Sequence, residues 1–162
     1  MQRWFWWVVI AGAAYMLFGR AASMPLEKLE RFDARRPAAA RAETYVGGSC
    51  GRQRCMLVYV APWCPQCRRA HGMILESVER LKAEGIETTV VLGMDDQAAL
   101  ERYAADFPFP VHLDPGKKLY DQLDARGVPY FTVWEQSREI VGDVAGRPDS
   151  FDHLMQVLEL PQ

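Results

Sequence analysis

The chain has 162 residues, a formal net charge of −2 at pH 7, and 25% charged residues. This length accommodates one domain of about 100 to 150 residues with its own core, together with a short appendage. Because charges of both signs are interspersed, the chain lacks the basic field that nucleic-acid binding requires, and we exclude nucleic acid as a partner.

The first 20 residues are predicted to be a signal anchor or a signal peptide. Residues 4–18 are uninterrupted apolar and small residues between Arg3 and Arg20. At about 1.5 Å per residue this run spans roughly 23 Å, short of the ~30 Å hydrocarbon core but typical of a signal-peptide core. Its tryptophans suit a membrane interface, and Arg20 interrupts the region where cleavage would occur, so an uncleaved anchor is favoured.

The compartment is predicted from two features that disagree. Residues 21–42, rich in Ala, Arg and Pro, are predicted to be a linker with one short helix near 26–35, and their arginines favour the cytoplasm. The paired cysteines favour an oxidising compartment instead. We expect the protein on the periplasmic side of the inner membrane, held there by its N-terminal helix, or free in the periplasm if residues 1–20 are cleaved.

Residues 43–162 are predicted to form one α/β domain. The expected strands are residues 43–46, 55–60, 88–92, 111–113, 130–134 and 139–144. The expected helices are residues 65–84, 95–105, 116–123 and 148–158. Alternating strands and helices, followed by a hairpin and a last helix, favour a mixed central sheet flanked by helices.

The central motif is the pair Cys64 and Cys67, which follows the strand at 55–60 and opens the helix at 65–84. Two cysteines at this spacing can close a small disulfide ring and reopen it. Only a thiolate is nucleophilic, and the unpaired N–H groups and partial positive charge of a helix N-terminus favour a thiolate at Cys64.

A second pair, Cys50 and Cys55, flanks a loop that a disulfide could close across a turn. A structural disulfide is favoured over a second redox pair or a metal site. Cys55 and Cys64 are expected at opposite ends of one strand, roughly 17 Å apart at ~3.3 Å per residue, which is too far for shared zinc ligation. We expect neither a metal nor a cofactor.

Two motifs together resemble the thioredoxin superfamily. They are the sequence WCPQC at 63–67 after a strand and, two βα units later, GVP at 127–129 before a hairpin. Residues 109–129 resemble the central insertion of TlpA/ResA-type, membrane-anchored extracytoplasmic thioredoxins. The resemblance covers residues 43–160 and implies a thioredoxin-like fold.

The resemblance also implies roles for individual residues. Cys64 would be the attacking thiol and Cys67 the resolving thiol. Pro129 would be a cis proline whose neighbour Val128 presents its backbone to the substrate. Independently of the resemblance, the position of Trp63 beside Cys64 favours a side chain that covers the active site and shapes the substrate groove over an ordinary core residue.

Two positions depart from the family pattern. Thioredoxin has a buried acid six residues before its first active cysteine, and this chain has Val58 there. ResA-type proteins have a glutamate on the active-site helix at the position of Ala70 in this chain. The usual proton acceptor for Cys67 is therefore missing or supplied elsewhere. His71, one helical turn after Cys67, is a candidate acceptor, against the alternative of an ordinary, partly buried histidine.

The resemblance implies a thiol–disulfide oxidoreductase that acts on extracytoplasmic protein disulfides. Reduction is favoured over oxidation, with an upstream electron-donor protein and cytochrome maturation as one expected role. The first alternative is a module that delivers Cu(I) bound by the same thiols, since thiolates suit this ion. A lesser alternative is a peroxiredoxin-like peroxidase, disfavoured because Ala61 stands where peroxiredoxins need Thr or Ser.

Overall fold

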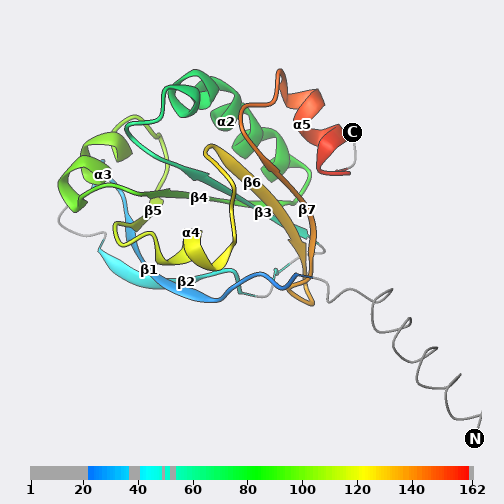
Figure 1. The fold of residues 1–162 in the computed structure, drawn as a ribbon, viewed down its shortest axis with the longest axis horizontal. Helices are drawn as coiled ribbons and strands as arrows, with labels where there is room; N and C mark the ends of the chain where they lie inside the picture. The colour runs from blue at the N-terminus through cyan, green and yellow to red at the C-terminus, as the bar shows by residue number, and fades with distance from the viewer. Residues whose placement is uncertain (1–21, 37–40, 49, 52–53, 161–162) are drawn as a thin grey trace, which may run out of the picture.

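The computed structural model describes residues 22–36, 41–48, 50–51 and 54–160, so the anchor predicted at 1–20 lies outside the described residues. One seven-stranded sheet has the order β2-β1-β5-β4-β3-β6-β7 (Figure 1). The strands are β1 (Glu27–Phe32), β2 (Ala42–Val46), β3 (Arg54–Val60), β4 (Glu87–Gly93), β5 (Val111–Asp114), β6 (Tyr130–Glu135) and β7 (Ile140–Ala145). The helices are α2 (Pro65–Ala83), α3 (Gln97–Ala104), α4 (Lys118–Gln122) and α5 (Phe151–Val157). Within these ranges no helix has the length and apolar character needed to cross a membrane.

The sheet is parallel at its centre and antiparallel towards both edges. β4 pairs in parallel with β3 and with β5, and the intervening helices α2 and α3 supply the crossovers that parallel strands need. The outer pairs β3–β6, β6–β7, β5–β1 and β1–β2 are all antiparallel. The α/β fold with a mixed central sheet, predicted from the sequence, is confirmed.

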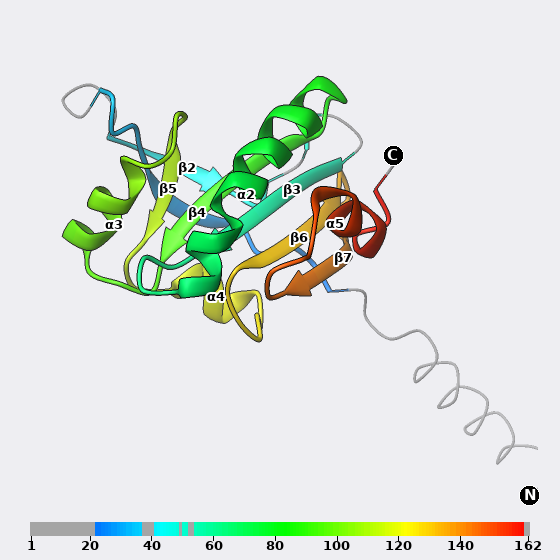
Figure 2. The same ribbon diagram turned by 90° about the horizontal axis from the view of Figure 1, so that it is seen from above.

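The two faces of β3 lie in two different cores, which explains why this strand is apolar throughout. Successive side chains of a strand point to opposite faces, and here helices cover both faces (Figures 1 and 2). The core beneath α2, α3 and α5 receives Met56, Val58 and Val60. The core on the side of α4 receives Cys55, Leu57 and Tyr59.

The prediction of a linker with one short helix before residue 43 is wrong over residues 27–32. These residues form strand β1, which pairs with both β2 and β5. The charged residues that suggested a solvated segment have partners elsewhere in the fold. The carboxylate of Glu27 accepts hydrogen bonds from Lys118 Nζ at 2.7 Å and from Gln122 Nε2 at 2.8 Å, both on α4. The sheet therefore includes residues that precede the predicted domain boundary.

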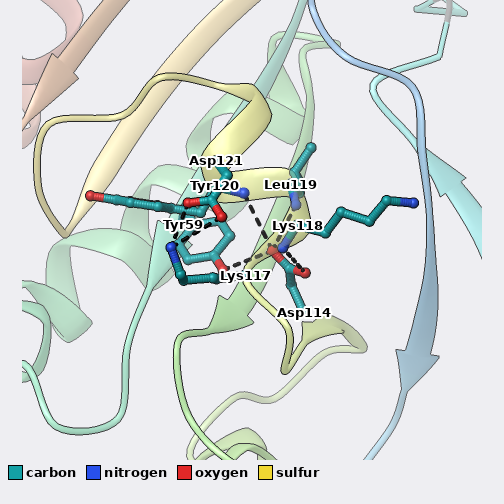
Figure 3. Close-up of polar contacts among 7 residues, drawn as sticks. All are labelled: Tyr59, Asp114, Lys117, Lys118, Leu119, Tyr120 and Asp121. Carbon is teal, nitrogen blue, oxygen red and sulfur yellow. Dashed lines mark hydrogen bonds and ion pairs between the residues drawn. The ribbon is translucent and has the colours of Figure 1, made fainter.

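A buried carboxylate links β5, β3 and α4 (Figure 3). Asp114 is 2% exposed and accepts a hydrogen bond from the Tyr59 hydroxyl at 2.9 Å. It also accepts hydrogen bonds from the first three N–H groups of α4 at 2.9, 3.0 and 3.3 Å. These donors satisfy a buried charge, and the carboxylate in turn satisfies helix N–H groups that have no partner within the helix. Gly93 leaves room for the tyrosine, since a Cβ there would collide with the Tyr59 hydroxyl.

We expect Asp114→Ala to lower the free energy of unfolding by about 2 to 4 kcal/mol, because it leaves the Tyr59 hydroxyl and the α4 N–H groups without their acceptor. Asp121→Ala is the matched control, since Asp121 on α4 pairs with the exposed Lys117 that precedes the helix, and exposed pairs contribute little. Urea unfolding of both variants measures the difference. Equal losses in the two variants would contradict a structural role for the buried carboxylate.

Candidate active site

Cys64 lies between the end of β3 and the first turn of α2, where it is the N-cap residue of the helix. Its backbone N–H donates a hydrogen bond to the Ala61 carbonyl oxygen at 3.2 Å. Its Sγ accepts a hydrogen bond from the Cys67 N–H, also at 3.2 Å. Pro65 follows as the first helical residue, where its missing N–H costs nothing. The sulfur of Cys64 thus takes the place that a capping oxygen usually has.

The antiparallel pairing of β3 with β6 brings residues 128 and 129 next to Cys64. Tyr59, near the end of β3, pairs with Tyr130, the first residue of β6. The Val128–Pro129 peptide bond is cis, and the Val128 carbonyl oxygen accepts a hydrogen bond from Cys64 Sγ at 3.4 Å. The structure therefore places the predicted attacking thiol against the backbone that was predicted to meet the substrate.

Trp63 lies at the surface next to Cys64, with 51% of its area exposed. Its indole Nε1 donates a hydrogen bond to the Met94 carbonyl oxygen at 2.9 Å. Met94 directly follows β4 and has φ of 64°, a left-handed conformation that is uncommon outside glycine. This backbone contact had no signal in the sequence, because any residue could supply the carbonyl group.

Cys67 is fully buried, at 0% exposed against 4% for Cys64. Burial raises the pKa of the Cys67 thiol, and its hydrogen bond with the Cys64 side chain raises it further, while a backbone hydrogen bond to Ala61 acts in the opposite direction. Val58 and Ala70, which occupy the positions of the two missing acids, are buried in the same core. At neutral pH Cys67 is therefore a protonated thiol. It must lose this proton before it can act as a nucleophile.

His71 lies one turn after Cys67 on α2 and packs against Phe107. The two rings meet edge to face, with their centroids 4.8 Å apart. Its Nδ1 atom is buried and has no hydrogen-bond partner among the residues that the structure describes. The role of His71 as proton acceptor for Cys67 stays a prediction.

Cys50 and Cys55 are joined by a disulfide with 5.7 Å between their Cα atoms, whereas Cys64 and Cys67 are free thiols. Cys55 lies near the start of β3, and Cys64 follows the other end of this strand. The two pairs are thus separated by the length of β3. In the described part of the chain, His, Cys, Asp and Glu side chains nowhere gather in a group of three or more that could hold a metal ion.

No protein-family model matches this sequence, and no curated protein matches it. Solved structures do match. A protein from Chlorobium tepidum, provisionally assigned as a thiol:disulfide interchange protein DsbE, superposes with a TM-score of 0.68 at 16% identity, over 86% of this chain and 98% of the other. The lipoprotein thioredoxin Etrx1 from Streptococcus pneumoniae has a TM-score of 0.65 at 16% identity, over 83% and 98%. StoA from Bacillus subtilis has a TM-score of 0.61 at 15% identity, over 83% and 97%.

These superpositions cover most of each chain and define the class of fold. The chain has a thioredoxin-like fold, and the fold class implied by the WCPQC and GVP motifs together is confirmed. At identities of 15 to 16% the likeness concerns the fold alone. The chemistry of the site depends on the two free thiols, the neighbouring Val128 carbonyl group and Trp63.

We expect iodoacetamide to label Cys64 of the native, reduced site faster than Cys67 at pH 7. Burial restricts access to Cys67, and its raised pKa keeps this thiol protonated and unreactive at neutral pH, so labelling of Cys67 should increase only as the pH rises. Peptide mass mapping measures both sites, with the Cys50–Cys55 disulfide left intact. Denatured protein, in which both thiols should react equally, is the control. Equal labelling in the native protein would contradict the difference in burial.

Proposed function

We propose that the protein is a thiol–disulfide oxidoreductase that acts on extracytoplasmic protein disulfides through Cys64 and Cys67. One observation carries the proposal: the free thiol of Cys64 caps α2 and also lies 3.4 Å from the carbonyl oxygen of Val128, next to a cis proline. The named activities of the similar structures, thiol:disulfide interchange and thioredoxin, support it.

In the proposed reaction, the Cys64 thiolate attacks one sulfur of a substrate disulfide and the other substrate sulfur leaves as a thiolate. The Cys67 thiol then loses its proton and attacks Cys64 Sγ, which releases the second substrate thiol and leaves a Cys64–Cys67 disulfide. Two electrons pass from the protein to the substrate. The exposed Trp63 and the backbone at residues 128–129 would contact the substrate chain, and an upstream donor protein would restore the dithiol.

We propose reduction as the physiological direction. A dithiol becomes an oxidant when its reduced form is stabilised. Burial raises the pKa of the Cys67 thiol and so disfavours a thiolate at this position. A negative charge on Cys67 therefore does not stabilise the reduced form of the pair. The proposed location is the periplasmic side of the inner membrane, with residues 1–20 as the anchor, and cytochrome maturation is one candidate role.

We expect Cys67→Ser to trap a mixed disulfide between Cys64 and a disulfide-bonded model protein such as insulin, because the resolving thiol is absent. Cys64→Ser is the matched control and should trap none, since the attacking thiol is then missing. Non-reducing electrophoresis followed by mass spectrometry identifies the adduct. Stoichiometric retention of Cu(I) by the wild type, without turnover of any disulfide, would favour the Cu(I) delivery module and contradict the enzyme.

The direction of electron flow is tested by the reduction potential of the Cys64–Cys67 pair, measured by equilibration in thiol–disulfide buffers. We expect a value of about −270 mV, as in thioredoxin, whereas a value of about −120 mV would make the protein an oxidant. The double variant Cys64→Ser/Cys67→Ser shows which part of the signal comes from the Cys50–Cys55 disulfide.

A further inference from the structure

Deprotonation of Cys67 needs a base, and the positions that carry one in related proteins are apolar here. Val58 is 0% exposed and Ala70 is 1% exposed, and both lie in the same core as Cys67. The side chains that could handle a proton must therefore come from other positions around this thiol. The inference below rests on the proposed function, since it concerns the step in which Cys67 resolves the mixed disulfide.

Two buried polar atoms close to this region have no hydrogen-bond partner among the described residues. They are Nδ1 of His71 on α2 and the hydroxyl oxygen of Tyr103 on α3. Buried polar atoms in folded proteins are nearly always paired, and an unpaired one costs stability, so each exception calls for an explanation. Three other buried atoms in the described residues are also unpaired, namely Glu30 Oε1, Thr88 Oγ1 and His112 Nδ1, so it is their place beside the thiol that singles out His71 and Tyr103.

The two residues are brought together by Phe107. The His71 and Phe107 rings are 4.8 Å apart at an interplanar angle of 70°, and the Tyr103 and Phe107 rings are 5.5 Å apart at 80°. Phe107 is 2% exposed and belongs to the core that contains Cys67. Both polar side chains thus flank one aromatic ring at the edge of the core on which the active-site thiols lie.

His71 is linked to Cys67 by its place on α2, and Tyr103 by the effect that a charge on Cys67 has on its hydroxyl group. His71 is four positions after Cys67, and side chains four apart on a helix are neighbours, with about 5 to 6 Å between their Cβ atoms. Burial and the negative charge of a Cys67 thiolate raise the pKa of Tyr103 to about 12. Its hydroxyl group therefore keeps its proton at neutral pH and is available as a hydrogen-bond donor.

We propose that His71 and Tyr103 together form the proton-accepting site for Cys67, in which His71 Nδ1 takes the proton and the Tyr103 hydroxyl donates a hydrogen bond towards the developing thiolate. The Cys67 S–H bond breaks and the proton passes through one water molecule to His71 Nδ1. The electron pair left on the sulfur forms the bond to Cys64 Sγ, and the bond between Cys64 and the substrate sulfur breaks. The imidazolium ion then returns its proton to the released substrate thiolate or to solvent.

Other charged and titratable groups act on the same site and must stay constant in a test. Asp106 and the Cys64 thiolate raise the pKa of Tyr103, as a Cys67 thiolate does, whereas the Arg68 guanidinium lowers it. Arg68 is held in place by two hydrogen bonds to the Pro62 carbonyl oxygen, at 3.1 and 2.9 Å. Tyr103→Phe and His71→Asn leave all of these groups unchanged.

The test follows the reaction of the reduced protein with 5,5′-dithiobis(2-nitrobenzoate), which separates the two steps. Attack by Cys64 releases one coloured thiolate in a first phase, and attack by Cys67 on the mixed disulfide releases a second. We expect Tyr103→Phe and His71→Asn to slow the second phase at least about tenfold at pH 7, which is modest for the loss of a catalytic base. The first phase should not change, and the second phase should recover at higher pH, where hydroxide replaces the base.

Tyr45→Phe and His153→Asn are the matched controls, because Tyr45 is 67% exposed on β2 and His153 is exposed on α5. Both should show wild-type phases. Tyr103→Phe keeps the ring against Phe107 and removes an unpaired hydroxyl group, so its melting temperature should equal or exceed that of the wild type. A slower second phase in a variant of undiminished stability distinguishes a chemical role from a structural one.

Two outcomes separate this inference from the proposed function. If both phases occur in the wild type and the second is equally fast in Tyr103→Phe, His71→Asn and the controls between about pH 5 and 9, the proton-accepting role is overturned and the oxidoreductase remains. If the wild type shows no second phase, the resolving role of Cys67 itself is overturned. Tyr103→Phe decides the first question even if His71→Asn does not fold, and His71→Gln repeats the test at position 71.

Discussion

The pairing register between β3 and β6 is the constraint on which the candidate site depends. Because Val58 pairs with Phe131 and Tyr59 with Tyr130, the chain that leaves β3 lies against the chain that enters β6. Cys64 and the Val128 carbonyl group meet for this reason, although 64 positions separate them. A slip of one residue would turn every side chain of β3 to the opposite face, so the two packed cores hold the register in place.

The structure contains two buried polar clusters that differ in how completely they are satisfied. Around Asp114, the Tyr59 hydroxyl and the start of α4 supply donors, and the cluster acts as a joint between two strands and a helix. Near Cys67, His71 Nδ1 and the Tyr103 hydroxyl have no partner in the described part of the chain. A fully satisfied buried cluster stabilises a fold, whereas each unpaired buried polar atom costs stability. The same physical rule thus separates a structural carboxylate from a site proposed to handle protons.

Features that depend on neighbouring residues could be predicted from the sequence. The strand at 55–60 and the helix at 65–84 match β3 and α2 within one residue at each end, because their apolar patterns and the Pro65 and Gly85 signals are local. The positions of Cys64 and Cys67 follow from these two elements. Their relation to residues 128–129 came only from the resemblance to thioredoxins.

Features that depend on distant partners were missed. The sequence of β1 resembles a charged linker. The side chains that donate hydrogen bonds to Glu27 lie on α4, about ninety residues later, and the local sequence does not reveal them. The Met94 carbonyl group and the Tyr103 hydroxyl were missed for the same reason, because their significance depends on side chains from other elements. Local periodicity carries no information about such contacts.

The N-terminal segment joins the sheet at the end opposite the dithiol. Ser23 forms a β-bridge with Glu139, and the Met24 N–H donates a hydrogen bond to the Arg138 carbonyl oxygen at 2.6 Å, so the chain enters the domain at the turn between β6 and β7. This turn lies at the start of β3, whereas Cys64 lies beyond its other end, about 20 Å away at ~3.3 Å per residue. A tether on residues 1–20 would therefore hold the domain at one end of the sheet, and Cys64 would lie at the opposite end. With such a tether, partners would approach the thiols from the side that faces away from the membrane.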